Sequence, residues 1–538
     1  MSAYVVEEFT AEEEDVLRRY FTNLDQPVFA LVNLPEVVKG ALFARYSRSP
    51  KSLRRLFLDE FVGELDIEGD ASIDATIGLE RAEDLYERIF IEYGDDSVAQ
   101  LGGIHLACEQ ASNLLTKILE WGRLAAYLEQ STRYIAYDAR PSGRYRYYRD
   151  SDVLNSALGT RYIGDLDRLF DTYARLTPRV QDFVRQSTPK APSDSDFVYR
   201  TAIKAKALDA VRGILPAAAQ SNVGIYGTGQ SYEQLLVRMR ADPLPEARAY
   251  ADLMLTELRK VIPSFVKRVD LADRGQISSA YIEDNRLAME AKAAELLGEA
   301  DVYDMDERVE LVDFDPDAEV KLVASMLYPY AQISERAIEA RVGQMSTDDR
   351  IGVMKAYNGE RQNRRHRPGR AMERPFYRFD VLADYGAFRD LQRHRMLTVE
   401  WQKLNPHHGY TRPPLIDEGG FRAEFDEAME RSAELYEALR EGGFAAQASY
   451  GVSLAYRVRF NLNLNARSAM HTIELRSTPQ GHPAYRAVVQ QMHSLIAKEA
   501  GHPAIAAMMG FVNHSSEAEL ERLEAERRAE AKRTGSTV

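Results

Sequence analysis

Two arginine-bearing stretches, far apart in the chain, contain the residues best suited to chemistry. The first includes Arg123, Glu129, Ser131 and Arg133, and the second is the triplet Arg393–Arg395. Guanidinium groups bind phosphates and carboxylates through paired, charge-assisted hydrogen bonds, so each stretch is a candidate site for a small anionic ligand. Each also has a simpler interpretation. Glu129 and Arg133 have the spacing of a surface ion pair on a helix, and the triplet has the composition of a solvated basic patch.

The overall charge limits the kind of partner. The formal net charge is −14, which argues against general nucleic-acid binding, because that binding needs a basic face to neutralise phosphates. The sequence is compatible with binding of a small anion, because local arginines can hold it despite the negative charge of the whole protein. The chain has one cysteine, no apolar run long enough for a membrane span and no signal-peptide core at its acidic N-terminus. These features predict a cytoplasmic protein without disulfides and without a membrane partner.

The elements that position these arginines are expected to be mainly helices. At 538 residues the chain is long for one hydrophobic core, so two domains are expected. The segment from Thr10 to Glu13 has the pattern of a capping box, and apolar residues recur at helical spacing from Leu114 to Leu119. Phe376–Val381 alternates as a strand does. The charged segment 516–538 is expected to be a solvated terminal helix that frays into a tail.

A faint internal repeat places matching landmarks in the same order in each half. The landmarks are a helical stretch, an arginine-bearing motif and a helix that carries arginine: 35–45 and 317–324, 121–134 and 393–405, 234–240 and 471–476. The region rich in Ala, Glu and Asp between them is the expected connector, at 271–305. Chance similarity between helical segments is the alternative explanation of these landmarks.

Together the two arginine motifs resemble the signature of the flavin-dependent thymidylate synthases (the ThyX family), whose pattern runs RHRxxSxNExSxR. Arg393–Arg395 matches the beginning of this pattern, and Glu129–Arg133 matches its end. The resemblance implies an α+β, helix-rich chain of two tandem ThyX-like domains, each with a small, mostly antiparallel sheet flanked by helices. The expected limits are 1–270 for the first domain, 271–305 for the connector, 306–515 for the second domain and 516–538 for the charged tail.

The second copy looks like the flavin-binding half. The resemblance assigns cofactor binding to residues of this copy and to one serine of the first copy: Arg393, His394, Arg395, Asn465, Arg467, Arg476 and Ser97. This copy departs from the pattern after the triplet, because Thr398 replaces the serine and the ExSxR part is missing. The arginine expected before the later element Asn465-Ala-Arg467 is replaced around 448–450. This copy is therefore expected to hold FAD and to bind a nucleotide poorly.

The first copy looks like the nucleotide-binding half. The resemblance implies substrate binding by Glu129, Ser131, Thr132, Arg133 and Arg212. It implies catalytic roles for Arg123, Ser131 and Arg240, with Ser131 orienting the substrate and not attacking it. This copy departs from the pattern at 121–123, where Trp-Gly-Arg stands in place of RHR, and it lacks the later flavin-facing element.

The basic segment Arg361–Arg370 lies where the family has its GHxSxxEH loop, of which Glu373 is kept. Three interpretations are open: a site for the adenosine diphosphate of the cofactor, a site for the anionic tail of a folate, or an exposed loop. The histidines show no spacing typical of metal ligands.

The reaction that the resemblance implies is reductive methylation of dUMP to dTMP with FAD, NADPH and methylenetetrahydrofolate. A composite site between the two repeats is expected, with two chains forming a pseudo-tetramer. The departures from the family pattern also fit a flavoenzyme acting on another pyrimidine nucleotide, or a non-catalytic flavin- or nucleotide-binding protein with a regulatory role.

Overall fold

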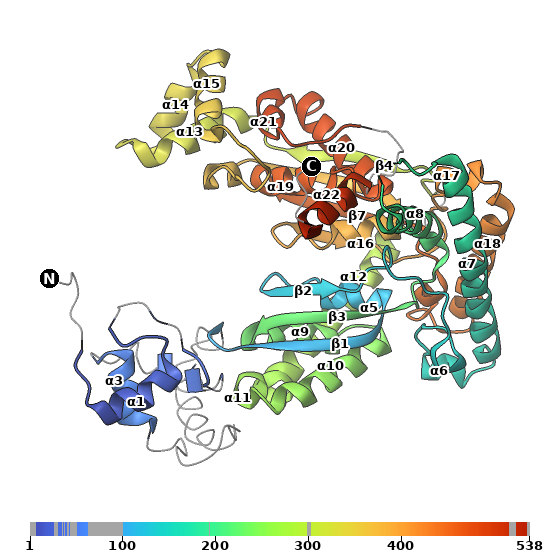
Figure 1. The fold of residues 1–538 in the computed structure, drawn as a ribbon, viewed down its shortest axis with the longest axis horizontal. Coiled ribbons are helices and arrows are strands. Elements are labelled where there is room, and N and C mark those ends of the chain that lie inside the picture. Colours follow the sequence, from blue (N-terminus) through green and yellow to red (C-terminus); the bar gives the residue numbers. More distant parts are fainter. Residues whose placement is uncertain are drawn as a thin grey trace. The chain divides into compact units, whose positions relative to one another are not determined.

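The structure is a computed structural model, and residue contacts divide it into two compact units (Figure 1). It describes residues 7–25, 29, 31–34, 36, 38–39, 42–43, 51–62, 100–192, 194–298, 303–515 and 523–534. Unit 1 comprises 1–109, 124–129 and 223–299, and unit 2 comprises 110–123, 130–222 and 300–538. The chain therefore passes between the units several times.

Unit 1 begins with two amphipathic helices, α1 (Ala11–Tyr20) and α3 (Leu53–Glu60). The predicted capping box is confirmed at α1, where Glu13 N donates to Thr10 Oγ1 at 3.2 Å and Thr10 N donates to Glu13 Oε2 at 2.9 Å. Phe21 and Phe57 pack edge to face, 5.4 Å apart, in a small core that these helices share. Most of the helix predicted over 35–45 lies outside the described residues.

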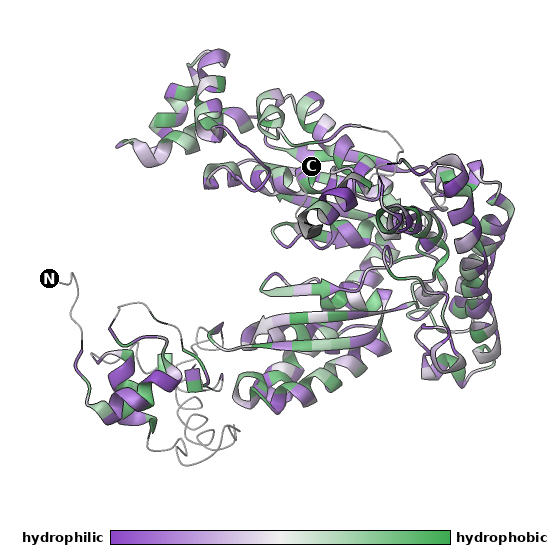
Figure 2. Ribbon diagram, in the orientation of Figure 1, coloured by the Kyte–Doolittle hydropathy of each residue, from purple (hydrophilic) through white to green (hydrophobic). Residues whose placement is uncertain are grey.

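The first sheet has three strands in the order β1-β3-β2: β1 (Gly103–Ser112), β2 (Ala125–Glu129) and β3 (Gln220–Thr228). Strands β2 and β3 are antiparallel. Buried positions alternate with more exposed ones along β3, as expected for a strand with one buried face. Figure 2 shows the hydropathy of the residues along the strands and helices. The helices that follow are α9 (Gly229–Arg240), α10 (Pro245–Arg259), α11 (Pro263–Val266) and α12 (Ile277–Leu297). Most of the predicted connector is thus helical, because α12 runs through it.

The sheet of unit 2 has four antiparallel strands in the order β4-β5-β7-β6: β4 (Arg308–Phe314), β5 (Phe376–Asp384), β6 (Thr398–Trp401) and β7 (Arg457–Asn465). The strand predicted over 376–381 is confirmed. The helices N-terminal to this sheet are α5 (Asn113–Leu119), α6 (Ser151–Leu154), α7 (Gly159–Ser187) and α8 (Asp196–Val211). Those within and after it are α13 (Ala318–Leu327), α14 (Glu335–Gly343), α15 (Thr347–Asn358), α16 (Tyr385–Leu391), α17 (Pro414–Glu418), α18 (Arg422–Glu441), α19 (Ala466–Arg476), α20 (Pro483–Lys498), α21 (Pro503–Met508) and α22 (Leu523–Thr534). None of the helices that the structure describes is both long enough and apolar enough to cross a membrane.

The order of the elements shows the tandem repeat. One half runs β1-α5-β2, then a helical insertion, the 3-10 turn Arg212–Ile214, β3 and α9. The other half runs β5-α16-β6, then a helical insertion, the 3-10 turn Ala448–Gly451, β7 and α19. The three matched strands also have the same order in each sheet. The predicted fold class is confirmed, whereas the limits of the two repeats stay a prediction.

Within unit 2, the equivalent turns of the two halves are joined by backbone hydrogen bonds. Ala217 N donates to Val452 O at 2.8 Å, Ala218 N donates to Tyr450 O at 3.0 Å, and Leu454 N donates to Leu215 O at 2.9 Å. This junction directly follows Arg212 and fixes its backbone against the second half.

The C-terminal charged helix is docked, contrary to the expectation of a solvated helix. Arg527 in α22 donates to both carboxylate oxygens of Asp194, at 2.5 and 3.0 Å, and the Asp194 side chain is buried. Ser195 Oγ donates to Glu530 of the same helix at 2.6 Å. The charge pattern of the segment did not indicate that Arg527 and Glu530 have specific partners in the fold.

Candidate functional site

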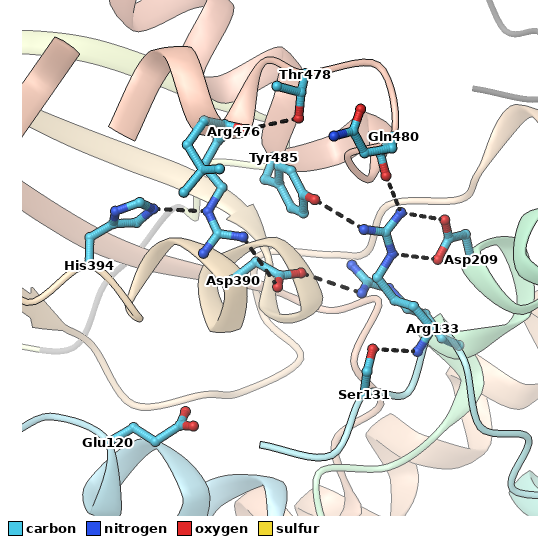
Figure 3. A network of polar contacts seen from close by, with 12 residues as sticks. Glu120, Ser131, Arg133, Asp209, Asp390, His394, Arg476, Thr478, Gln480 and Tyr485 are labelled. Carbon is cyan, nitrogen blue, oxygen red and sulfur yellow. Dashed lines mark hydrogen bonds and ion pairs between the residues drawn. The ribbon is translucent and has the colours of Figure 1, made fainter. Parts of the chain in front are cut away.

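Asp390, near the end of α16, lies among arginines contributed by both halves of the chain (Figure 3). Its carboxylate oxygens lie 3.6 Å from Arg212 Nη1 and 3.7 Å from Arg476 Nη1. Burial alone would raise the pKa of Asp390, but the nearby guanidinium groups of Arg476, Arg393, Arg212 and Arg133 hold it well below its usual range. All of these residues belong to unit 2, so one compact body brings the two sets of predicted arginines together.

Arg133 is held by a second buried acid. Its Nε and Nη2 donate to the two carboxylate oxygens of Asp209, at 2.7 and 2.6 Å, and its Nη1 donates to Tyr485 Oη at 3.0 Å. Burial opposes ionisation of Asp209, but Arg133 overrides it and holds the pKa of Asp209 at about 2. Arg133 follows strand β2 in a turn, so the alternative of a helix-surface ion pair with Glu129 is wrong. Arg133 is already largely engaged and is well suited to hold Asp209 and Tyr485 in place.

Arg212 has an incomplete set of hydrogen-bond partners. Its side chain is 5% exposed, and Nη2 is buried without a hydrogen-bond partner among the described residues. A Cβ added to Gly386 would lie 3.0 Å from this Nη2 and 2.9 Å from Asp384 Oδ1, so the glycine lets the guanidinium approach the start of α16. An unsatisfied buried donor costs about 1–3 kcal/mol, which binding of an anion would recover.

His394 and Arg476 form the next part of the cluster. Arg476 Nε donates to His394 Nε2 at 2.9 Å, which leaves the proton of a neutral imidazole on Nδ1. Burial, reinforced by the charge of Arg476, lowers the pKa of His394 well below its usual value. Tyr485 lies between the two arginines, its ring centroid 5.4 Å from Arg476 Cζ and 5.8 Å from Arg133 Cζ. His394 is therefore a neutral donor beside a cation.

His482 is a second neutral imidazole in the cluster. Its Nδ1 accepts from Ala484 N at 3.2 Å, so the proton lies on Nε2, 3.3 Å from Asp209 O. Burial, followed by the charge of Arg212, lowers the pKa of His482 to about 3. No group of three or more metal-ligating side chains occurs in the described parts of the chain.

Among the remaining predicted cofactor residues, Asn465 and Arg467 lie at the start of α19, and Arg395 lies between α16 and β6. Asn465 Oδ1 accepts from Ser468 N at 2.9 Å and caps α19, and Arg467 pairs with Glu373 at 3.0 Å. Arg395 is exposed. Ser97 lies outside the described residues. Their role in binding flavin stays a prediction.

Arg123 contacts the second half of the chain. Its Nη2 donates to Thr398 Oγ1 at 3.0 Å, and Trp121 Nε1 donates to Val399 O at 3.3 Å. The rings of Trp121 and Trp401 pack edge to face with centroids 5.4 Å apart. The residues that replace the RHR triplet in the first half therefore pack against the degenerate motif of the second half.

The other predicted substrate residues are divided between the units. Ser131 Oγ accepts from Arg133 N at 3.2 Å, and Thr132 is buried beside it. Glu129 ends strand β2, and Arg240 ends α9, where it pairs with Asp252 at 2.5 Å. Glu129 and Arg240 belong to unit 1, whereas Ser131, Thr132 and Arg133 belong to unit 2.

Sequence reasoning missed the acids and the tyrosine of the cluster. Asp209 and Asp390 each precede a predicted arginine by three residues, Arg212 and Arg393. The repeated spacing of an aspartate three residues before an arginine could have indicated these two acids. No feature of the sequence near Tyr485 indicates that it belongs to the cluster.

Comparisons with known proteins agree with this architecture. The family model described as "Thymidylate synthase complementing protein" (Thy1) matches residues 44–264 and 310–502, one segment in each half. A UPF0159 protein of Chlamydia muridarum is 39% identical over 533 residues, which is 97% of this chain and 99% of the relative. The UPF0159 protein Ta1429 of Thermoplasma acidophilum is 32% identical over 523 residues, 92% of this chain and 99% of the relative.

A solved structure with limited similarity is a UMP/dUMP methylase, PolB from Streptomyces cacaoi, bound with 5-Br dUMP. It is 20% identical, covers 38% of this chain and 97% of its own, and has a TM-score of 0.30. A TM-score this low does not establish a shared fold. The two-segment family match, with the same element order in each half, shows that the chain belongs to the Thy1 (ThyX) family.

Proposed function

We propose that this protein is a flavin-dependent thymidylate synthase that methylates dUMP to dTMP with FAD, NADPH and methylenetetrahydrofolate. The observation that carries the proposal is the cluster around Asp390. Its carboxylate lies 3.6 Å from Arg212 of one half and 3.7 Å from Arg476 of the other, and Arg133 and Arg393 also act on it. Family membership supports a methyltransferase-type enzyme acting on a small nucleotide.

Arg212 is the proposed phosphate-binding residue. Its buried Nη2 needs an acceptor, and a guanidinium fork matches two oxygens of a phosphate. Asp390 lies beyond hydrogen-bond distance from Arg212 Nη1, at 3.6 Å, so it neutralises charge without saturating the donors. Arg133, already paired with Asp209, is proposed to position this region.

The donors on the other side of Asp390 fit an anionic flavin. Arg393, His394, Arg395 and Arg476 would hold it, and neutral His394 offers an Nδ1–H to a ring oxygen or nitrogen. The flavin, when bound, supplies the reducing equivalents of the reaction. The contribution of the chain is to orient the nucleotide and to stabilise negative charge that develops on the pyrimidine ring, for which no enzyme nucleophile is needed. We propose that Ser131 contributes to this orientation.

The decisive experiment separates the two ligands on the full-length protein. The absorption spectrum reports bound flavin, and titration calorimetry reports dUMP. Charge-assisted hydrogen bonds are worth about 1.5–3 kcal/mol, so Arg212→Gln should weaken dUMP binding by roughly 10- to 100-fold and retain flavin. Arg393→Gln should lose bound flavin and retain dUMP binding.

The controls exclude unfolding and general charge effects. Arg185→Gln changes an arginine of α7 that pairs with Asp182 and is 45% exposed, and it should change neither affinity. Arg212→Lys keeps the charge and should restore part of the dUMP affinity. A colourless protein that binds no dUMP contradicts the proposal. Binding of both ligands without turnover favours the non-catalytic alternative, and turnover of a different pyrimidine nucleotide favours the related flavoenzyme.

We also propose that two chains form a pseudo-tetramer. Helix α12 of unit 1 contains no buried residue and exposes Tyr281, Leu287, Met289, Leu296 and Leu297. An apolar set of this kind on a helix is typical of a surface that contacts another protein copy. Light scattering should give the mass of two chains, and replacing Leu287 and Met289 by Ser should shift it toward one.

A further inference from the structure

The basic segment Arg361–Arg370 is anchored to the core of unit 2. Arg361 Nη1 and Nη2 donate to the two carboxylate oxygens of Glu474 in α19, both at 2.6 Å, and the two side chains are 5% and 1% exposed. Arg361 Nε also donates to His366 O at 2.6 Å. The segment therefore has a defined conformation, held against α19 by these contacts.

Beyond the anchor, the segment presents arginines without acidic partners. The side chains of Arg364, Arg365 and Arg367 make no hydrogen bond or ion pair with any residue that the structure describes. Arg370, by contrast, pairs with Glu373 at 3.0 Å. Three like charges within four residues repel one another, and a bound polyanion would relieve this repulsion.

The anchor to Glu474 holds the basic segment against α19, one turn from His471, where Arg364 and Arg367 act on this imidazole. Burial, with the charges of Arg367, Arg364 and Arg476, lowers the pKa of His471 to about 4. The His471 ring lies 5.6 Å from that of His394, which accepts from Arg476. His471 thus lies between the basic segment and the cluster around Asp390.

We propose that Arg364 and Arg367, with His471, bind the diphosphate of a dinucleotide. A diphosphate carries two negative charges on several acceptor oxygens, which suits two guanidinium forks and a neutral imidazole donor. The inference rests on the proposed function for the source of the diphosphate, since FAD and NADPH both carry one.

The test uses the full-length protein and ADP as the probe. The double variant Arg364→Gln/Arg367→Gln should bind ADP at least 10-fold more weakly, whereas the matched control Arg370→Gln should stay within about twofold of the wild type. Competition identifies the source, because ADP displaces whichever of FAD and NADPH uses the segment. Equal ADP affinity in the wild type and the double variant overturns the proposal, as does tighter binding of triglutamate than of ADP.

An independent readout is the His471 imidazole, followed by NMR titration. Saturating ADP should raise its pKa toward the ordinary value, and the double variant should show the same rise without ligand. If dUMP and flavin bind normally while ADP leaves His471 unchanged, this inference fails alone. If ADP binds at the segment and dUMP does not bind at all, the proposed function fails alone.

Discussion

Some largely buried arginines of this protein lie near a carboxylate without forming a close ion pair with it. Arg212 and Arg476 approach Asp390 only to 3.6 and 3.7 Å, whereas Arg133 makes a close bidentate pair with Asp209. A bidentate buried pair stabilises a fixed arrangement, and longer pairs leave donors for a ligand. The two kinds of pair therefore separate positioning residues from candidate binding residues.

Removing Arg133 should destabilise the fold. Arg133→Met leaves the carboxylate of Asp209 buried without its partner, which costs about 3–5 kcal/mol. Urea denaturation should show this loss, and adding Asp209→Asn to Arg133→Met should restore part of it. An unchanged unfolding midpoint in the single variant contradicts a structural role for the pair.

His482 should make the protein sensitive to acid. Between its ordinary pKa of 6.5 and the folded value of about 3, the unfolded chain binds a proton that the folded chain does not. The unfolded state then binds more protons, so the free energy of unfolding falls as the pH falls through this window. Denaturant melts at pH 7 and pH 5 should show a smaller loss for His482→Gln than for the wild type. The exposed His366→Gln should behave as the wild type, and identical losses in all three proteins would contradict the prediction.

At the scale of elements, helix α16 links the sheet of unit 2 to the site. It starts directly after β5, with Ala387 N donating to Asp384 Oδ1 at 2.9 Å, and it carries Asp390 near its last turn. Gly386 near its start gives Arg212 room. Burial raises the pKa of Asp384 to about 6 even though Arg212 opposes the rise.

Adding one methyl group to α16 should therefore affect ligand binding. Gly386→Ala places a Cβ 3.0 Å from Arg212 Nη2, and the guanidinium must move. The affinity for dUMP should fall roughly 5- to 10-fold, which is about 1–1.4 kcal/mol. Calorimetry measures this change, and Gly343→Ala at the end of α14, with no atom within 4 Å of the new Cβ, is the matched control. Equal affinities in the two variants would show that Arg212 does not need this space.

Local sequence patterns predicted individual elements well. The cap at Thr10, the helix 113–119 and the strand beginning at Phe376 each follow from short-range spacing and are confirmed. The partners of Arg133 and Arg361 were not predictable in this way, because Asp209 and Glu474 meet them only through the tertiary fold. The local sequence pattern predicts whether a segment is a helix or a strand, but it does not predict which distant residues will contact that segment.

At the scale of the whole molecule, the two halves have diverged in complementary ways. The first half keeps Arg133 and Arg212, and the second keeps Arg393 and Arg476, all within unit 2. The family resemblance predicted that these residues would meet, and the cluster around Asp390 agrees with it. The assignment of each residue to flavin or nucleotide stays a prediction.

Each chain should bind one nucleotide. In the lost motifs, Arg123 donates to Thr398 and Trp121 donates to Val399 O, so these donors are engaged within the chain and do not offer a second site to a ligand. Equilibrium dialysis with dUMP should saturate at one molecule per chain, and Trp121→Ala should leave this value unchanged. Saturation at two per chain would show that both pseudo-equivalent sites are competent.

The contact between Arg133 and Tyr485 spans 352 positions of the chain. During synthesis, Arg133 leaves the ribosome long before Tyr485. The surroundings of Arg133 are therefore complete only after Tyr485 has been made. A nucleotide therefore cannot assist the folding of the nascent N-terminal portion through this site, and it stabilises the protein only after nearly the whole chain has been made.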